Sequence, residues 1–588
     1  MTQFEVFKDG KRKVYEIQDM RVAKALRALD GNPGSQNVFL KIARGFTAVK
    51  RIGITLTPDF ILRNMVRDYM SANVFSKQGA LPFKDVAIAM GDLWKRNDHY
   101  YNWLKSGGAN GAFLELNSKY LETDIFKVAK ETGFIENMQN TLTSAIDVLA
   151  FAGNIIESAP RLAEFKRTAK GASSGPAVFE GGFASREITL DFQRMGLKTQ
   201  ALNSIAAFMN AQVQGLDKTA RTFKEDPTGL LLRGGALITA PTVMLWALQH
   251  DDPRYQEIPQ WQRDLAWNIV TDDWQLAQSD EEWNGLPEHL VKDSPDGKLI
   301  NKGVIVRIPK PQELGLVFAT MPERILQLML TDDPQSGKEM IKTLWETMVP
   351  NITPDVGAPP LEQVTNYNLF TGRPLIPHHL EKEVPAYRYT EYTSDSAKVL
   401  GKMLGAIPLI QETSIASPIV IENYVRGWTG SMGQYMLRTI DGALTKSGII
   451  KAPETPAWTV ADIPFVKAFF VRNPSIQAES IQRFYELSES VTQVMTSTKN
   501  QTKKGHWDDV EYLNTFYGEP MAKMDGWRKA LSNQGQFIRD VYESDYTQAE
   551  KRQLIDTTYY QMIEIAKLAN SEMDLMKKTM KDRTKENP

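Results

Sequence analysis

The chain contains no cysteine among its 588 residues and only six histidines. Without cysteine it can form no disulfide, no thiolate nucleophile and no cysteine-ligated metal site. No HExxH string occurs, which excludes the helical zinc site of a metalloprotease. We therefore expect neither a metal nor a cofactor.

The chain also lacks an excess of charge of either sign. Lys and Arg total 69 and Asp and Glu total 71, which excludes the strongly basic composition of a general nucleic-acid binder. The opening MTQFEVFKDGKRKVYEI has no apolar run of the signal-peptide kind. The hydrophobic share of 42% is normal for a folded protein, and this length predicts more than one domain.

A long hydrophobic run is missing as well. The longest uncharged apolar stretch, residues 234–249, is shorter than the roughly 20 residues that span a bilayer and contains Pro241. It is not a constitutive anchor. Two interpretations stay open: a buried core helix kinked at Pro241, or an amphipathic segment that inserts conditionally. The candidate membrane contacts of the second are Leu237, Ile238, Leu245 and Trp246.

Helical periodicity dominates what is present. It predicts a mainly α, multi-helix, multi-domain fold with small β-hairpins near residues 4–17 and 296–309. Asp9-Gly10 supplies the turn of the first hairpin, and Val304–Ile308 alternates as a strand in the second.

We expect three domains. Residues 1–335 form a helical domain that includes the N-terminal hairpin. Residues 336–450 form a proline- and glycine-rich connector with a helical extension, in which residues 350–378 are a long ordered loop or linker. Residues 451–588 form a C-terminal helical domain with a coiled-coil-like end.

That end carries apolar residues in alternating steps of three and four, the spacing of a coiled-coil seam. The seam either docks on its own domain or joins copies of the chain. The candidate self-association residues are Tyr559, Met562, Met573, Met576 and Met580.

A polar stripe interrupts an otherwise apolar helix in ITLTPDFILRNMVRDYMSANVFSK, residues 54–77. Thr57 can cap this helix and Pro58 suits its first turn. The stripe is a hydrogen-bonded clasp to another helix with Arg67 and Asp68 partly buried, a solvated face, or a catalytic cluster. The candidate clasp residues are Thr57, Pro58, Asn64, Arg67 and Asp68.

Strings that suggest catalysis stand in the wrong context. GASSG at residues 171–175 fits GxSxG, but a nucleophile elbow follows a strand, whereas a helical pattern precedes this string. We expect no catalytic residues and no enzyme.

Several strings together carry a resemblance. TLTPDFILRNMVRD, WLKSGGANGAF, PKPQELGLVFATMPERI and SPIVIENYVRGWTG resemble the bacteriophage family called large polyvalent protein-associated domain 38. The resemblance spans roughly residues 1–445. It implies a helical fold and a virion context, and it transfers no catalytic residue.

From this resemblance and the helical, cysteine-free composition we expect an internal virion protein ejected with the phage genome. It would help form an oligomeric DNA-translocation conduit across the host envelope. Its location would be the virion interior and then the host envelope or periplasm. The expected partners are further copies of the chain, other ejection or portal-associated proteins, a transient host membrane and DNA without sequence specificity. The alternatives are a non-ejected head-core or tail scaffold and a module that delivers a fused enzyme.

Overall fold

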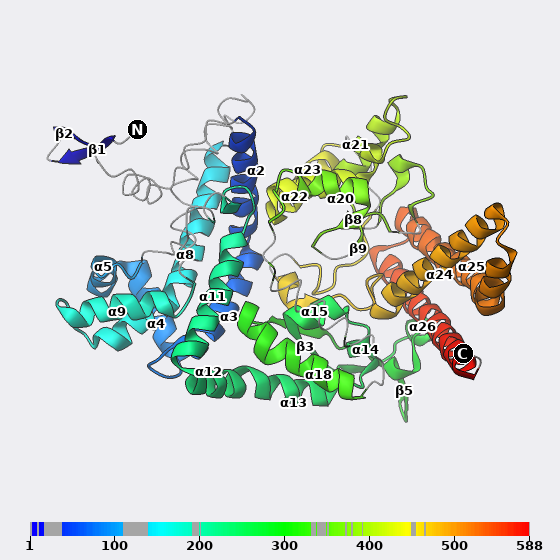
Figure 1. Ribbon diagram of the computed structural model, residues 1–588, viewed down its shortest axis with the longest axis horizontal. Coiled ribbons are helices and arrows are strands. Elements are labelled where there is room, and N and C mark those ends of the chain that lie inside the picture. The colour runs from blue at the N-terminus through cyan, green and yellow to red at the C-terminus, as the bar shows by residue number, and fades with distance from the viewer. Residues whose placement is uncertain are drawn as a thin grey trace.

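The computed structural model describes residues 3–8, 11–16, 38–109, 139–190, 199, 202–330, 337, 349, 352–370, 373–377, 380–390, 392–448, 454–463 and 466–586. These residues form a mainly helical protein with small antiparallel sheets (Figure 1), which confirms the predicted fold class.

The N-terminal hairpin forms where it is predicted. β1 (Gln3–Lys8) and β2 (Lys11–Glu16) pair antiparallel, with Phe4 opposite Tyr15.

The first group of helices surrounds one hydrophobic core. Trp103, Leu162 and Phe165 are fully buried in it, and the indole Nε1 of Trp103 donates to Oγ of Ser185 at 2.7 Å. The helices around this core are α3 (Pro58–Phe75), α4 (Phe83–Lys95), α5 (Asp98–Lys105), α8 (Gln139–Ala169) and α9 (Pro176–Glu187). α2 (Val38–Thr55) precedes them and contributes Ile52 to a separate small core.

A long helical rod follows α11 (Met209–Glu225). It consists of α12 (Pro227–Gly234), a π-helical turn (Gly235–Thr239) and α13 (Ala240–Gln249), and it runs along the lower edge of the molecule in Figure 1. Pro241 lies in the first turn of α13, directly after the π turn, and the wider π turn accommodates a residue that lacks the N–H of a regular helical bond.

Short helices and strands fill the middle of the chain. The helices are α14 (Pro253–Gln256), α15 (Gln260–Leu265), α16 (Asp280–Trp283), η3 (Glu288–Leu290), α17 (Gln312–Gly315), the π turn η4 (Leu316–Thr320) and α18 (Met321–Leu330). The strands are β3 (Ala266–Val270), β4 (Trp274–Leu276), β5 (Val291–Ser294), β6 (Gly297–Asn301) and β7 (Ile305–Pro309).

The strands of the predicted 296–309 hairpin exist but do not pair with each other. β6 lies between β4 and β5, whereas β7 lies between β3 and β10 (Phe470–Val471) of another sheet. The side chain of Asn301 explains the change of sheet, because its Oδ1 accepts the N–H groups of Asp273 and Gly303 and holds the chain in a bend. The predicted pairing of β6 with β7 was therefore wrong, while antiparallel strands in this region are confirmed, with β6 forming its hairpin with β5.

Residues 350–378 are not one long loop. They contain the helix α20 (Ala358–Thr365) and the two-residue strands β8 (Tyr367–Asn368) and β9 (Arg373–Pro374). The prolines that suggested a loop stand in the first turn of α20, where proline is well tolerated. η6 (Pro385–Tyr387), α21 (Asp395–Gly405), η7 (Ser414–Ala416), α22 (Pro418–Thr429) and α23 (Ser431–Lys446) follow.

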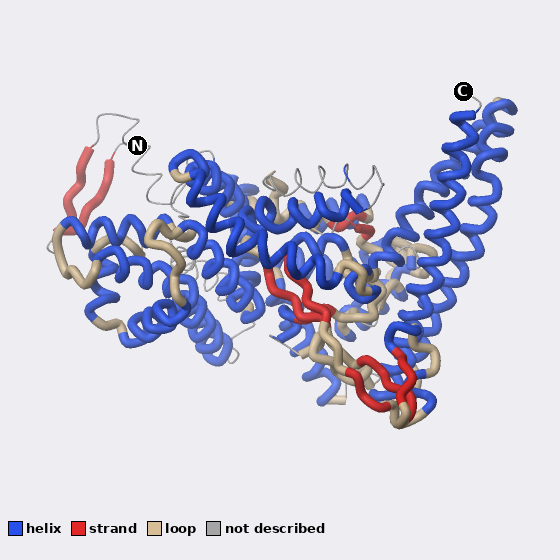
Figure 2. The backbone as a smooth tube through the Cα atoms, turned by 90° about the horizontal axis from the view of Figure 1, so that it is seen from below, coloured by secondary structure: helices blue, strands red, loops and turns tan. Residues whose placement is uncertain are grey.

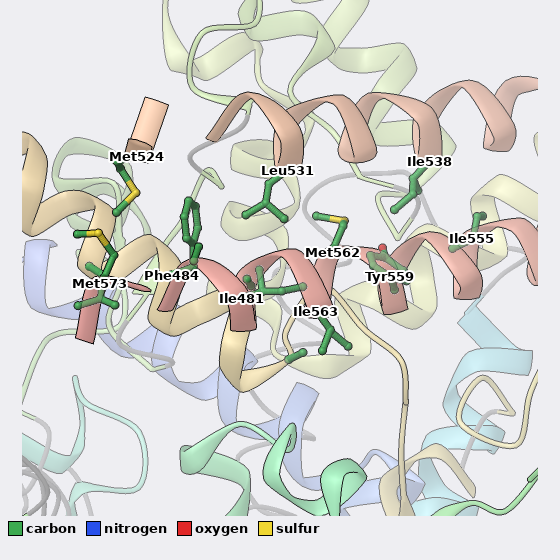
Figure 3. Packing of buried hydrophobic residues seen from close by; sticks show 14 of the residues in the cluster. Ile481, Phe484, Met524, Leu531, Ile538, Ile555, Tyr559, Met562, Ile563 and Met573 are labelled. Atoms are coloured by element: carbon green, nitrogen blue, oxygen red, sulfur yellow. The ribbon is translucent and has the colours of Figure 1, made fainter. Parts of the chain in front are cut away.

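The C-terminal part is a bundle of three long helices, preceded by η8 (Val466–Phe469). α24 (Glu479–Lys504), α25 (Trp507–Glu543) and α26 (Gln548–Glu586) pack side by side, and the bundle projects from the rest of the molecule in Figure 2. Its core includes Phe484, Leu531 and Ile538 (Figure 3), each at most 3% exposed.

Candidate functional site

The helical rod of residues 227–249 presents an apolar stripe to solvent. Its exposed large side chains are Leu231, Leu232, Leu237, Met244 and Leu248, and Ala236, Ala240 and Ala247 between them are exposed as well. The rod is the one helix among the described residues that is long and apolar enough to cross a membrane, and 22% of its apolar window is buried. Such exposure of contiguous apolar residues is typical of an interaction surface.

The opposite side of the rod is fixed to the protein by specific contacts. Hydroxyl Oγ1 of Thr242 accepts the indole N–H of Trp267 at 2.7 Å, and both residues are buried. The amide of Gln249 donates to the carbonyl of Asn268 at 3.1 Å and accepts the N–H of Val270 at 2.6 Å. The rod is therefore held along the surface of the molecule.

Gly234 allows the closest approach on this packed side. A Cβ atom at this position would lie 2.6 Å from the ring of Phe318. Thr239 adds a hydrogen bond from its hydroxyl to the Phe318 carbonyl at 2.7 Å.

The four predicted membrane contacts divide between the two sides. Leu237 is 43% exposed and belongs to the stripe, whereas Ile238 is 1% exposed. Leu245 packs against the core beside Ile238, and Trp246 stacks on His250 with ring centroids 4.4 Å apart. The rod is therefore a buried core helix on one side only, and its other side is exposed to solvent. Of the missed residues, Leu231 and Leu232 could have been found by extending the helix to the Asp226-Pro227 start signal. Met244 and Leu248 already lie in the predicted stretch, and their exposure depends on how the rod packs.

The polar stripe of α3 is largely enclosed. Thr57 occupies the N-cap position, yet its hydroxyl donates to the carbonyl of Ile54 at 2.7 Å instead of capping the helix. Pro58 takes the first turn as predicted. Asn64 donates from Nδ2 to Oδ2 of Asp68 at 2.8 Å, within the same helix.

The links from α3 to other helices come from residues at its two ends. Asp59 accepts the hydroxyl of Tyr435 on α23 at 3.1 Å, and Ser76, just past the helix, donates to Oε1 of Glu164 on α8 at 2.9 Å. Among the described residues, neither Arg67 nor Asp68 hydrogen-bonds to another helix. The hydrogen bonds of the predicted clasp are therefore not seen at Arg67 and Asp68.

The electrostatics of Asp68 show how enclosed it is. Burial, and after it the nearby carboxylate of Glu157, raises the pKa of Asp68 to about 7, while Arg161 and Arg67 oppose the shift. Burial also raises the pKa of Glu313 to about 7, although Arg67 favours its charged form. A solvated face would not shift these groups so far.

The C-terminal seam is filled from within the chain. Tyr559, Met562 and Met573 are at most 4% exposed in the core of the three-helix bundle (Figure 3). Of the two interpretations, docking on its own domain is the one seen for these three residues. The side chains of Met576 and Met580 lie outside the described part of α26.

In the part of the chain that the structure describes, no group of three or more His, Asp or Glu side chains could hold a metal ion. The GASSG string lies between α8 and the start of α9, without the strand that a nucleophile elbow requires.

Comparison with known proteins relates one segment of the chain to a family. No curated protein and no solved structure matches the chain. A family model does match residues 252–466, a narrower range than the resemblance suggested and one that excludes residues 55–68. This segment reaches from α14 to η8 and contains both three-stranded sheets except β10. Residues 252–466 of this helical protein thus form a large polyvalent protein associated domain 38.

Proposed function

We propose that this chain is a non-enzymatic internal virion protein of a bacteriophage, ejected with the genome and contributing to an oligomeric conduit for DNA across the host envelope. The apolar stripe on residues 227–249 is the observation that carries the proposal. The matched family, whose members the resemblance places in phage virion proteins, supports the phage context.

The dimensions of the rod suit a membrane. Its 23 residues correspond to about 34 Å of helix, against about 30 Å for the hydrocarbon layer. Because Thr242 and Gln249 hold one side of the rod to the protein, the first contact would be interfacial, with the stripe in the headgroup region and the axis along the surface.

Deeper insertion would require those polar contacts to break first. The bundle, the hairpin and the rod would then be separate parts of one conduit subunit, with the rod supplying the membrane contact.

A non-ejected head-core or tail scaffold remains the second candidate, together with a module that delivers a fused enzyme. The projecting three-helix bundle favours the scaffold, since long helical bundles serve well as spacers and assembly elements. A scaffold would leave the apolar stripe covered by protein and not by lipid.

Quantitative mass spectrometry on full virions and on DNA-emptied ghosts tests ejection. We expect the chain in full virions and its loss from ghosts, measured against the major capsid protein. Equal amounts in both would contradict ejection and favour the scaffold. Absence from both would contradict the virion role itself.

Vesicle flotation tests the membrane contact. Leu248→Asp, at a position 79% exposed, should reduce binding to anionic vesicles. Leu409→Asp, at a position 91% exposed outside the rod, is the matched control and should bind like the wild type. Leu245 is a poor site for this test because it packs into the core. Equal binding by all three proteins would contradict the role of the stripe.

A further inference from the structure

A cluster of cationic side chains lies where α3, β7, η8 and α23 meet. α3 packs against β7 and η8, and β7 packs against η8, while Tyr435 links α23 to α3. The cluster consists of Arg63, Arg67, Arg307, Arg438 and Lys467, which lie near enough to act on one another electrostatically.

A chain of contacts connects one side of the cluster. Arg63 donates to the carbonyl and to Oδ2 of Asp59, both at 3.0 Å. The other carboxylate oxygen of Asp59 accepts the hydroxyl of Tyr435 at 3.1 Å. Lys467 places its ammonium 4.9 Å from the centre of the Tyr435 ring. Asp59 and Tyr435 therefore connect Arg63 to Lys467.

Arg307 joins the cluster from β7 through neutral partners. Its guanidinium donates to the carbonyl of Ala468 at 3.1 and 3.2 Å and to that of Lys467 at 3.3 Å, and it reaches Oε1 of Gln262 at 3.5 Å. These acceptors orient the guanidinium but bring no negative charge.

Arg67, one turn after Arg63, is the least satisfied member. Its Nε is buried and has no hydrogen-bond partner among the described residues. A buried guanidinium N–H without a hydrogen-bond partner carries a desolvation cost that an anion can offset.

The cations outnumber the carboxylates that face them. Asp68 and Glu313 act on Arg67, and Asp59 acts on Lys467 and pairs with Arg63. Asp68 and Glu313 are only partly ionised near neutral pH because burial raises their pKa values to about 7. Burial, and then Arg63, lowers the pKa of Arg67 to about 10. Burial, and then Arg63 and Arg67, lowers the pKa of Arg307 to about 10. The cations thus repel one another.

We propose that this cluster is a binding site for a phosphate group, which would bridge the guanidinium groups of Arg63, Arg67 and Arg307. Planar guanidinium groups bind phosphate oxygens through paired hydrogen bonds. The site is open on the side of Arg63, whose side chain is 34% exposed, and of Arg438, which is exposed. The phosphate can belong to a nucleic-acid backbone or be free phosphate. The inference rests on the cluster alone and goes beyond the proposed function.

The test uses the full chain. Isothermal titration calorimetry with inorganic phosphate, at constant ionic strength set with chloride, measures binding of the free anion. Fluorescence anisotropy with a labelled DNA oligonucleotide, with and without competing phosphate, measures binding of a nucleic-acid backbone. The variant is Arg67→Met, which removes the charge and keeps an apolar side chain, so that the fold should persist. Circular dichroism checks the fold.

Arg483→Met is the matched control, because Arg483 is a half-exposed arginine of the bundle that pairs with Asp574. We expect Arg67→Met to weaken binding at least tenfold and Arg483→Met to leave it within twofold. DNA binding that phosphate competes away would identify a nucleic-acid backbone, and binding of phosphate without DNA would identify the free anion. Absence of both kinds of binding in the wild type, or equal loss in the two variants, would overturn the proposal.

Discussion

Thr242 and Trp267 form a buried hydrogen bond across the interface between the rod and the sheet. Indole Nε1 of Trp267 on β3 donates to Oγ1 of Thr242 on α13 at 2.7 Å, and the same hydroxyl donates to the carbonyl of Ile238 at 2.6 Å. One hydroxyl thus joins the rod to the sheet that lies in the matched family domain.

Replacing Thr242 by valine should destabilise the protein by about 1–3 kcal/mol, because the shape is kept and the buried indole N–H loses its acceptor. Urea denaturation followed by tryptophan fluorescence measures the change. Thr242→Ser keeps the hydroxyl and should recover part of the loss. Equal destabilisation by Thr242→Val and Thr242→Ser would mean that this hydrogen bond does not hold the rod to the sheet.

The same substitution makes a prediction for lipid binding. A rod less firmly fixed to the sheet should leave the surface more readily, so Thr242→Val should bind anionic vesicles more tightly than the wild type in flotation. Weaker binding by a folded Thr242→Val protein would indicate that the rod must stay docked to contact lipid.

The buried seam of α26 predicts a cost in stability. Met562 is 1% exposed in the bundle core, so Met562→Ala should cost about 2–5 kcal/mol through lost burial and the cavity that remains. Leu575→Ala, at a position 66% exposed on the same helix, should stay within about 0.5 kcal/mol. Guanidinium denaturation followed by circular dichroism compares them.

Analytical ultracentrifugation of the same variants addresses self-association. Because Met562 faces α24 and α25 of its own chain, we expect the sedimentation of Met562→Ala to match the wild type under native conditions. A change in sedimentation with unchanged stability would instead favour a seam between copies.

The sequence predicts the helices well because their signals are local. Apolar spacing lies within the segments that it defines. So does the Asp226-Pro227 start that we overlooked, where the Asp226 carboxylate accepts the N–H of Gly229 at 2.9 Å. The prediction of a loop at residues 350–378 was wrong for a local reason as well, because the prolines at the start of α20 were interpreted as helix breakers.

Long-range partners could not be predicted from one sequence. Asp59 and Tyr435 are 376 positions apart, and nothing in the pattern near either residue specifies the other. The cationic cluster was missed for the same reason. Arg63 and Arg67 lie on one face of a predicted helix, but nothing in the sequence indicates that Arg307 and Lys467 lie beside them. The pairing of β7 with β10 instead of β6 is a third case, because β10 comes from beyond residue 469.

Asp68 gives a prediction for pH. Its pKa rises from the ordinary range near 4 to about 7 in the folded state, chiefly through burial. The folded protein therefore holds this proton where the unfolded chain has lost it, so Asp68 contributes stability at pH 4 that is lost as the pH rises toward 7.

Asp68→Asn removes this titration. Relative to the wild type, the variant should become more stable as the pH increases from 5 to 8, as measured by urea midpoints at each pH. Asp296→Asn, at an exposed carboxylate of the turn between β5 and β6, is the control and should follow the wild-type profile. Because the neutral amide also removes a negative charge that faces Arg67, Asp68→Asn should strengthen phosphate binding at pH 8 and change it little at pH 5. Parallel pH profiles for all three proteins would mean that Asp68 is ionised in the folded chain throughout this range.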